Sequence, residues 1–249
     1  MASQGTKWDL SGRVALITGG SRGIGEACAE AMVDAGARVV AVARNQNDLD
    51  QLADRLGSDV ETWAEDVNER RFLRRLERLD RLDILFNNAG TNSPQPFVNI
   101  SEEILDEMIA VNVRAMFLTA QSAARVMLRN GAGGSIINMS SQMGHIGAAN
   151  RTAYCMTKHA VEGLTKSLGV ELAVHGIRVN SVAPTFIETP MTLPMFEDRD
   201  FKQWALDFIP MGRIGQLREV VAAVMFLASP DSSLMTGSSL KVDGGWTAR

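Results

Sequence analysis

The sequence has few of the residues that define several common classes of protein. It contains two cysteines, Cys28 and Cys155, which are too few for a disulfide framework, and each falls in a segment with helical character. The three histidines and few cysteines offer no metal-ligand spacing of the zinc kind, so no metal site is predicted. Free cysteines favour a reducing compartment, and we expect a cytoplasmic protein.

The chain also lacks a long apolar run and an excess of basic charge. No segment approaches the ~18 apolar residues that would cross a bilayer, and the first ten residues lack the apolar core of a signal peptide. The net charge is −4, which gives no reason to expect nucleic acid or an anionic membrane as a partner. The basic cluster within 69–83 alternates with Glu, Asp and Leu, as on the solvated face of an amphipathic helix.

What the chain does contain is an alternation of short apolar runs and longer helical patterns. The strand-like runs cover 13–18, 37–44, 60–66, 83–90, 135–141, 177–184 and 238–245. The longest helical patterns lie at 101–129 and 152–175. This alternation predicts an α/β fold of βαβ units: one Rossmann-type domain over 1–249, with a doubly wound seven-stranded parallel sheet and helices on both faces. Residues 185–212 break the rhythm and are the candidate substrate lid.

A glycine cluster, TGGSRGIG at 18–25, joins the first strand to the first helix. Gly19, Gly23 and Gly25 permit a tight turn and let backbone N–H groups approach a pyrophosphate. The N-terminus of the following helix then faces the phosphates. A purely structural turn is the alternative, but the strand–helix context favours a dinucleotide.

The only tyrosine of the chain, Tyr154, lies four residues before Lys158 in a helical segment. Residues four apart share one helix face, so the lysine can reach toward the phenol. Hydride transfer to a ketone develops negative charge on its oxygen and needs a proton donor. The reference pKa of tyrosine is ~10, and we expect the ammonium of Lys158 to lower the pKa of Tyr154.

Together the motifs resemble those of the classical short-chain dehydrogenase/reductase family. They are TGGSRGIG, NNAG at 87–90, a Ser-Ser pair thirteen residues before YxxxK, RVNSVAP at 178–184 and a late DGG. The resemblance covers nearly the whole chain in the family's order. It implies an NAD(P)-dependent oxidoreductase that interconverts a ketone and a secondary alcohol. The catalytic residues that it implies are Asn112, Ser141, Tyr154 and Lys158.

The resemblance also implies roles for two of these residues. Ser141 would hydrogen-bond the substrate oxygen; strand alternation turns its rival, Ser140, to the other face. Asn112 would bend its helix and bind a water that relays protons from the lysine. A polar Asn among apolar helical residues is costly unless it is hydrogen-bonded, and a satisfied core Asn is the alternative reading.

The resemblance further assigns cofactor contacts. Asp66 and Val67 would hold the adenine, and 88–90 would form the wall beside the adenosine ribose. The backbone of Ile187 and the hydroxyl of Thr189 would hold the carboxamide. The full predicted set is Gly19, Ser21, Arg22, Gly23, Ile24, Gly25, Arg44, Asp66, Val67, Asn88, Ala89, Gly90, Tyr154, Lys158, Pro184, Thr185, Ile187 and Thr189. Thr185 departs from the family's Pro-Gly and adds a Cβ and a hydroxyl beside the nicotinamide.

The end of the second predicted strand indicates which nicotinamide cofactor binds. Ala43 and Arg44 stand where an NAD-specific site usually has a carboxylate. A guanidinium suits a 2′-phosphate, and Arg22 in the glycine loop is a second candidate. We predict NADP(H) over NAD, with a solvated Arg44 and an Arg22 at the pyrophosphate as alternatives. Asp48, the nearest acid, is expected to complement the dipole of the next helix.

The substrate is less closely specified. The candidate contacts are Gln142, His145, Arg151, Phe186 and Met191. His145 is read first as an ordinary loop histidine, and Arg151 as a solvated or paired residue that could instead hold a carboxylate. The polar loop predicts a small polar carbonyl, a sugar or a polyol, and SSQ, YCxTK and APT resemble the dicarbonyl and xylulose reductase branch.

Two alternatives remain beside this carbonyl reductase or sugar dehydrogenase reading. The first is reduction of 3-oxoacyl chains on a carrier protein. The second, from another class, is a non-catalytic cofactor-binding regulatory protein. The resemblance also implies a homotetramer in which helices 101–129 and 152–175 pair with their copies.

Overall fold

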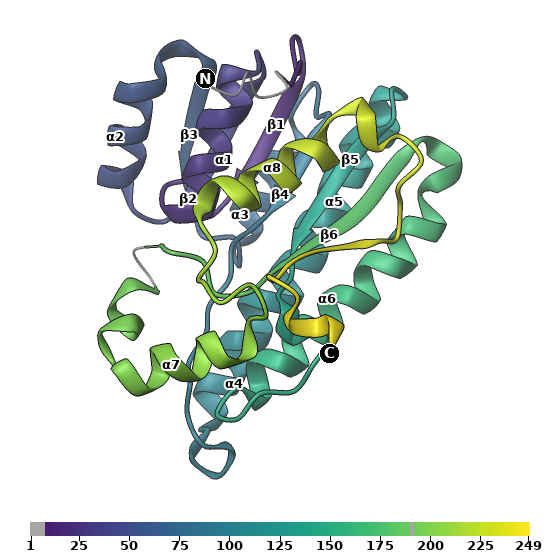
Figure 1. Ribbon diagram of the computed structural model, residues 1–249. Coiled ribbons are helices and arrows are strands. Elements are labelled where there is room, and N and C mark those ends of the chain that lie inside the picture. Colours follow the sequence, from purple (N-terminus) through teal and green to yellow (C-terminus); the bar gives the residue numbers. More distant parts are fainter. Residues whose placement is uncertain (1–7, 190–191) are drawn as a thin grey trace, which may run out of the picture.

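The computed structural model describes residues 8–189 and 192–249, and it is built around one parallel sheet (Figure 1). Its strands lie in the order β3-β2-β1-β4-β5-β6-β7. They are β1 (Val14–Thr18), β2 (Arg38–Ala43), β3 (Val60–Ala64), β4 (Ile84–Asn87), β5 (Gly134–Met139), β6 (Ile177–Pro184) and β7 (Ser239–Val242). The order reverses between β1 and β4. Doubly wound sheets bind ligands at the carboxyl ends of the strands at such a point.

Helices cover both faces of the sheet. The helices are α1 (Gly23–Asp34), α2 (Gln46–Leu56), α3 (Arg70–Glu77), α4 (Glu102–Ile109), α5 (Met116–Asn130), α6 (Thr152–Glu171), α7 (Arg199–Phe208) and α8 (Leu217–Ala228). One core joins the sheet to α1, α2 and α8, and the other joins it to α3, α5 and α6. Because the inner strands are buried on both faces, they read as continuous apolar runs. The predicted fold class is confirmed.

The predicted helix 101–129 is divided in the structure. A π-helical turn, Ala110–Ala115, separates α4 from α5 and contains the buried Asn112. The Asn112 side-chain amide bonds the backbone of Thr91 outside the helix, and such a partner favours an irregular turn. The periodicity of the sequence predicted helix throughout but did not reveal this interruption.

Residues 185–189 and 192–212, which we call the lid, stand apart from the two helical layers (Figure 1). The lid contains α7 and forms a small apolar core together with Ile214 and Trp246. This core consists of Ala205, Ile209, Ile214 and Trp246, with Phe186, Phe196 and Trp204 packed against it. The predicted break in the βα rhythm is therefore a helical flap rather than a structureless loop.

Within the described ranges, no helix has the length and apolar character needed to span a membrane.

Candidate active site

The glycine loop between β1 and α1 is a turn with almost no room for side chains. A Cβ on Gly25 would lie 2.1 Å from the carbonyl oxygen of Gly19, so any side chain would push α1 away from the loop. Among the described residues, no side chain caps the N-terminus of α1, which leaves its first N–H groups available to an anion. This cradle fits the pyrophosphate of a dinucleotide.

The loops after β1 and β4 are tied into one unit. The hydroxyl of Thr18 accepts hydrogen bonds from the backbone N–H groups of Asn88 and Ala89, both at 3.0 Å. The Asn88 amide in turn donates to the carbonyl oxygens of Thr18 at 3.0 Å and Gly19 at 3.2 Å. Asn88 therefore holds the glycine loop in place. Sequence reasoning missed Thr18, because a threonine that ends a strand gives no signal of such a long-range contact.

The end of β2 presents positive charge. Arg22 and Asp48 form an ion pair with Nε 2.5 Å from Oδ2 and Nη2 2.9 Å from Oδ1. Asp48 lies in the first turn of α2 as expected, but it also neutralises part of the charge of Arg22. Arg44 is exposed and forms no hydrogen bond or ion pair with any residue that the structure describes. A guanidinium without a described partner thus stands at the position predicted to distinguish NADP from NAD.

The other predicted cofactor residues lie along the same edge of the sheet. Asp66 follows β3, and its carboxylate accepts a 2.8 Å hydrogen bond from the backbone N–H of Asn68. Thr185 follows β6 and donates its backbone N–H to Val242 at 3.0 Å, while its hydroxyl is buried without a partner among the described residues. This unpartnered hydroxyl distinguishes Thr185 from the glycine that the family pattern predicts.

Ile187 and Thr189 are held by a residue that the sequence reading missed. The hydroxyl of Thr192 donates to the carbonyl oxygen of Ile187 and accepts from the backbone N–H of Thr189 at 3.0 Å. It also lies 3.0 Å from the hydroxyl of Thr189. The Thr-x-x-Thr spacing is a local turn signal that could have identified Thr192.

Ser141 and Tyr154 meet at the carboxyl end of β5. The Ser141 hydroxyl accepts from the backbone N–H of Met143 at 3.1 Å and is hydrogen-bonded to the Tyr154 hydroxyl. Ser140 does not share this position: its hydroxyl is buried with no partner among the described residues. The structure therefore brings together the predicted serine and tyrosine.

The pKa of Tyr154 shifts opposite to the expected direction. Burial raises the pKa of Tyr154 to about 12, because a buried phenolate loses its hydration. The hydrogen bond from Ser141 and the charge of Arg151 oppose this rise without overcoming it. The expectation that Lys158 lowers this pKa is therefore wrong for the isolated chain, and the phenol is protonated at neutral pH.

Lys158 lies beside the tyrosine and is itself buried. Its ammonium is 5.5 Å from the centroid of the Tyr154 ring and donates a 2.8 Å hydrogen bond to the carbonyl oxygen of Met139. Burial lowers the pKa of Lys158 to about 8, and the nearby Glu162 carboxylate acts in the opposite direction. A Cβ on Gly90 would lie 3.8 Å from this ammonium, so the loop after β4 reaches the reacting centre.

Asn112 faces the same region and has a full set of partners. Its Oδ1 accepts from the backbone N–H of Thr91 at 2.8 Å, and its Nδ2 donates to the Thr91 carbonyl at 2.8 Å and the Thr157 hydroxyl at 3.2 Å. A Cβ on Gly90 would lie 3.2 Å from Oδ1. Asn112 therefore connects the loop after β4 to α6, and its role in a water relay stays a prediction.

The candidate substrate residues separate into groups. Gln142 and Arg151 are buried, and neither the Gln142 Oε1 atom nor the Arg151 guanidinium has a hydrogen-bond partner among the described residues. The residue Arg151 is largely buried, and it is not paired with a described residue. His145 is directed toward Glu162 and Ser239 instead of a free pocket. Phe186 belongs to the aromatic cluster of the lid, and Met191 lies outside the described residues.

Comparison with known proteins gives matches over almost the whole chain. A family model described as Enoyl-(Acyl carrier protein) reductase matches residues 19–247. The chain is 42% identical over 240 residues to L-xylulose reductase of Bos taurus, which covers 96% of this chain and 98% of the relative. It is 36% identical over 242 residues to the 3-oxoacyl-acyl-carrier-protein reductase of Vibrio harveyi, covering 95% and 98%.

The fold also matches that of solved structures over almost the whole chain. The gluconate 5-dehydrogenase of Burkholderia cenocepacia, solved with NADP and tartrate, has a TM-score of 0.92 and 35% sequence identity, and the match covers 98% of each chain. The glycine cradle, the Ser141–Tyr154 pair and these matches agree on one assignment. The chain belongs to the short-chain dehydrogenase/reductase family and is an NAD(P)-dependent oxidoreductase that interconverts ketones and secondary alcohols.

Proposed function

We propose that the protein is an NADPH-dependent reductase of small hydroxylated ketones of the sugar or polyol type. The observation that carries this proposal is a set of buried polar groups without partners beside the Ser141–Tyr154 pair. One is Oε1 of Gln142, which follows Ser141 and has no partner among the described residues. Arg151, which precedes Tyr154 by one helical turn, is 7% exposed as a residue, and its guanidinium forms no hydrogen bond with the described residues. Such groups cost free energy unless a ligand pairs with them.

A third segment adds polar groups to the same region. The backbone N–H of Gln95 donates to the carbonyl oxygen of Asn150 at 3.1 Å, and Thr91 is bonded to Asn112. Residues 91–95 therefore run beside the beginning of α6. Oδ1 of Asn92, in this segment, is also buried without a described partner. A ligand rich in hydroxyls could pair with groups from all three segments, whereas a long alkyl chain would leave them unsatisfied.

The charge states of the residues favour the direction of reduction. The bound cofactor supplies the hydride. Ser141 is placed to donate a hydrogen bond to the carbonyl oxygen, where negative charge develops. Tyr154, with a pKa of about 12, is protonated at neutral pH and is therefore ready to donate its proton to the alkoxide. The ammonium of Lys158 lies 5.5 Å from the centroid of the Tyr154 ring.

The NADP preference rests on Arg44 and Arg22. Arg44 has no partner among the described residues, and the carboxylate nearest to it in sequence is paired with Arg22. We expect Arg44→Ala to lower kcat/KM for NADPH by about tenfold, a loss of ~1.4 kcal/mol, with little effect on NADH. Arg38→Ala, at the opposite end of the same strand, is the matched control. Equal losses for both cofactors, or a wild-type preference for NADH, would contradict the proposal.

A substrate panel tests the ketone class. Xylulose, ribulose, diacetyl and an acetoacetyl thioester are each supplied with NADPH, and kcat/KM is compared. We expect the ketoses or diacetyl to be preferred. The similarity to the Vibrio harveyi enzyme supports the competing 3-oxoacyl substrate, and activity on the thioester alone would replace the sugar reading with that one. Adding the 5-ketone of gluconate tests whether Arg151 pairs with a carboxylate, and Arg151→Gln should then reduce that activity selectively.

We also propose that the protein is a cytoplasmic homotetramer. Both cysteines are free, as expected in a reducing compartment. Several apolar side chains are exposed on α4, α5 and α6, the helices predicted to pair: they are Ile109, Phe117, Leu128 and Met156. Light scattering should give four times the 27.0 kDa chain mass, and a monomer at micromolar concentration would contradict the tetramer.

A further inference from the structure

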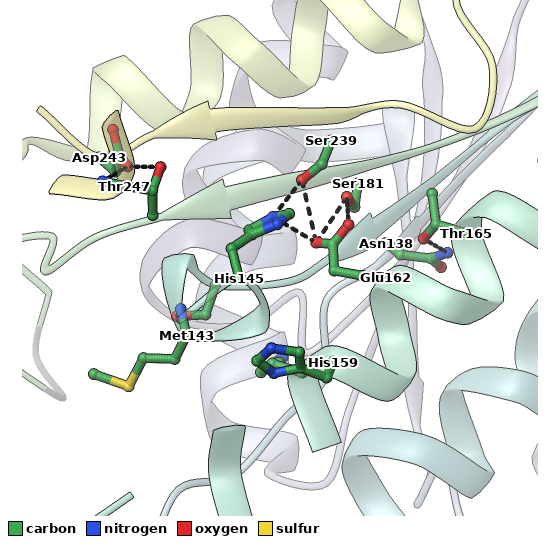
Figure 2. Close-up of polar contacts among 12 residues, drawn as sticks. Asn138, Met143, His145, His159, Glu162, Thr165, Ser181, Ser239, Asp243 and Thr247 are labelled. Carbon is green, nitrogen blue, oxygen red and sulfur yellow. Dashed lines mark hydrogen bonds and ion pairs between the residues drawn. The ribbon is translucent and has the colours of Figure 1, made fainter. Parts of the chain in front are cut away.

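A buried carboxylate lies one helical turn beyond the catalytic lysine and has no place in the reaction above. Glu162 is 5% exposed and accepts hydrogen bonds from the hydroxyls of Ser181, at 3.0 and 3.1 Å, and Ser239, at 3.2 Å. Nε2 of His145 lies 3.3 Å from Oε1 of Glu162 and 2.9 Å from the hydroxyl of Ser239. Figure 2 shows these four side chains converging from α6, β6, β7 and the loop after β5.

The cluster is not a second nucleophilic site. In a Ser-His-acid triad the nucleophile and the acid contact opposite nitrogens of the imidazole. Here Ser239 and Glu162 both contact Nε2 of His145. The cluster therefore cannot pass a proton from the serine through the ring to the carboxylate, and its contacts indicate a structural or electrostatic task.

The same carboxylate side chain packs under the turn that carries the catalytic serine. This turn, Gln142–Gly144, begins directly after Ser141, which caps it. A Cβ on Gly144 would lie 2.9 Å from the carbonyl oxygen of Lys158 and 3.1 Å from Cγ of Glu162. The turn thus packs against α6 with no spare space. The contact of His145 with Glu162 also ties the residue after the turn to α6. The position of Ser141 relative to Tyr154 depends on this closure.

The carboxylate also acts on the lysine through its charge. Burial lowers the pKa of Lys158 to about 8, and Glu162 opposes that shift. Burial also lowers the pKa of His145, and so do the positive groups around it, while Glu162 raises it. Those positive groups are Lys241 on β7 and His159 and Lys166 on α6. His145 is therefore neutral at neutral pH and leaves the negative charge of Glu162 to act on Lys158.

We propose that Glu162 is a positioning residue for ketone reduction: it fixes the turn bearing Ser141 against α6 and sustains the positive charge of Lys158. The role does not depend on which ketone is reduced, and any substrate that the enzyme accepts can serve in its test. Glu162 touches neither substrate nor cofactor in this scheme and acts only through Ser141 and Lys158.

The test compares pH profiles of kcat/KM for reduction with saturating NADPH. Glu162→Gln removes the charge and keeps the size of the side chain. We expect the alkaline limb of the profile to move about one unit to lower pH, because Lys158 loses a negative neighbour. We also expect kcat to fall about tenfold while KM for the ketone changes less than twofold. An alkaline limb in the wild-type position would overturn the electrostatic role.

Two further variants separate charge from contact. Ser181→Ala removes a hydrogen-bond donor but leaves the carboxylate, so its alkaline limb should stay in place; a shift equal to that of Glu162→Gln would overturn the assignment to charge. Glu162→Asp keeps the charge but is one methylene shorter, so kcat should fall several-fold with the limb unmoved. If Glu162→Gln does not fold, Glu162→Asp decides alone: wild-type kcat in this variant would overturn the positioning role.

Discussion

Different interactions hold the lid and the proposed catalytic wall, which we define as Asn112, Ser141, Tyr154 and Lys158. In the wall, Asn112 and Lys158 are almost fully buried and fixed by hydrogen bonds of 2.8 Å to backbone groups. Around α7, the lid packs through contacts between aromatic rings. Phe186 packs edge-on against Phe201 and Trp204, with ring centroids 5.4 and 6.2 Å apart.

From this difference we infer that the wall carries out the chemistry and that the lid recognises the ketone. Hydrogen bonds to backbone groups are directional and fix the angles that proton transfer requires. Ring contacts tolerate sliding and tilting, so the lid can adjust to the shape of a ketone. Variants of the wall should therefore change kcat, and variants of the lid should change KM.

The largest expected effect comes from Tyr154→Phe, which removes the proton donor and keeps the ring. We expect kcat for ketone reduction to fall about 1,000-fold, with NADPH affinity measured by fluorescence within about twofold of wild type. The variant should keep its melting temperature, because the ring still fills its site. A variant that turns over at the wild-type rate would remove Tyr154 from the chemistry.

A smaller loss is expected when the wall is displaced without changing its chemical groups. In Gly144→Ala the new Cβ would lie 2.8 Å from the Ser140 hydroxyl and 2.9 Å from the Lys158 carbonyl, so the turn after Ser141 must move off α6. We expect kcat to fall between about 10- and 100-fold.

Gly147→Ala is the matched control for this displacement. Gly147 lies in the same loop, and a Cβ there would meet nothing within 4 Å. Its kcat should match wild type. Equal kcat values for the two alanine variants would show that the turn need not be held against α6.

The lid is tested by Trp204→Ala, which removes a ring in contact with Phe186 and Phe208. We expect KM for the ketone to rise about tenfold and kcat to stay within about twofold. Phe97→Ala, an exposed phenylalanine outside the lid, should leave both values unchanged. If Trp204→Ala lowered kcat and left KM unchanged, the claim that the lid acts on ketone binding alone would be contradicted.

The smallest expected effect is a gain in stability, in contrast to the losses of activity above. The pKa of Lys158 is about 8 in the folded chain against an ordinary 10.5, so the unfolded chain binds more protons between these values. The free energy of unfolding of the protein therefore rises with pH between these two pKa values. Lys158→Met removes the buried charge, so it should be inactive yet melt a few degrees higher at pH 7, with the difference shrinking toward pH 10. A lower melting temperature at pH 7 would contradict the cost of this burial.

Much of this arrangement could be predicted from the sequence, because it depends on local patterns. The alternating runs predicted the sheet, and the glycine spacing and YxxxK predicted the loop and the helix face that the structure contains. Contacts between distant segments left no such pattern. Thr18 holding Asn88, and Glu162 joining β6 to β7, are visible only when the strands are side by side.

The wrong expectations have one physical cause: the sequence does not show how far the fold buries Tyr154 and Arg151. Lys158 at helical spacing from Tyr154 suggested a lowered phenol pKa, but the loss of hydration on burial outweighs the favourable contributions. Arg151 looked like a solvated residue and is buried. Sequence spacing predicts which groups are neighbours, whereas the energy of a charge depends on how much water the fold removes from it.

The proton donor can be tested directly because the chain has one tyrosine. Its ionisation gives the only tyrosinate absorbance, which can be followed as the pH of the cofactor-free protein is raised while circular dichroism monitors folding. With a pKa of about 12 for Tyr154, the folded protein should show almost no tyrosinate at pH ~10. Half ionisation near pH ~10 with the fold intact would contradict the claim that burial keeps this phenol protonated for ketone reduction.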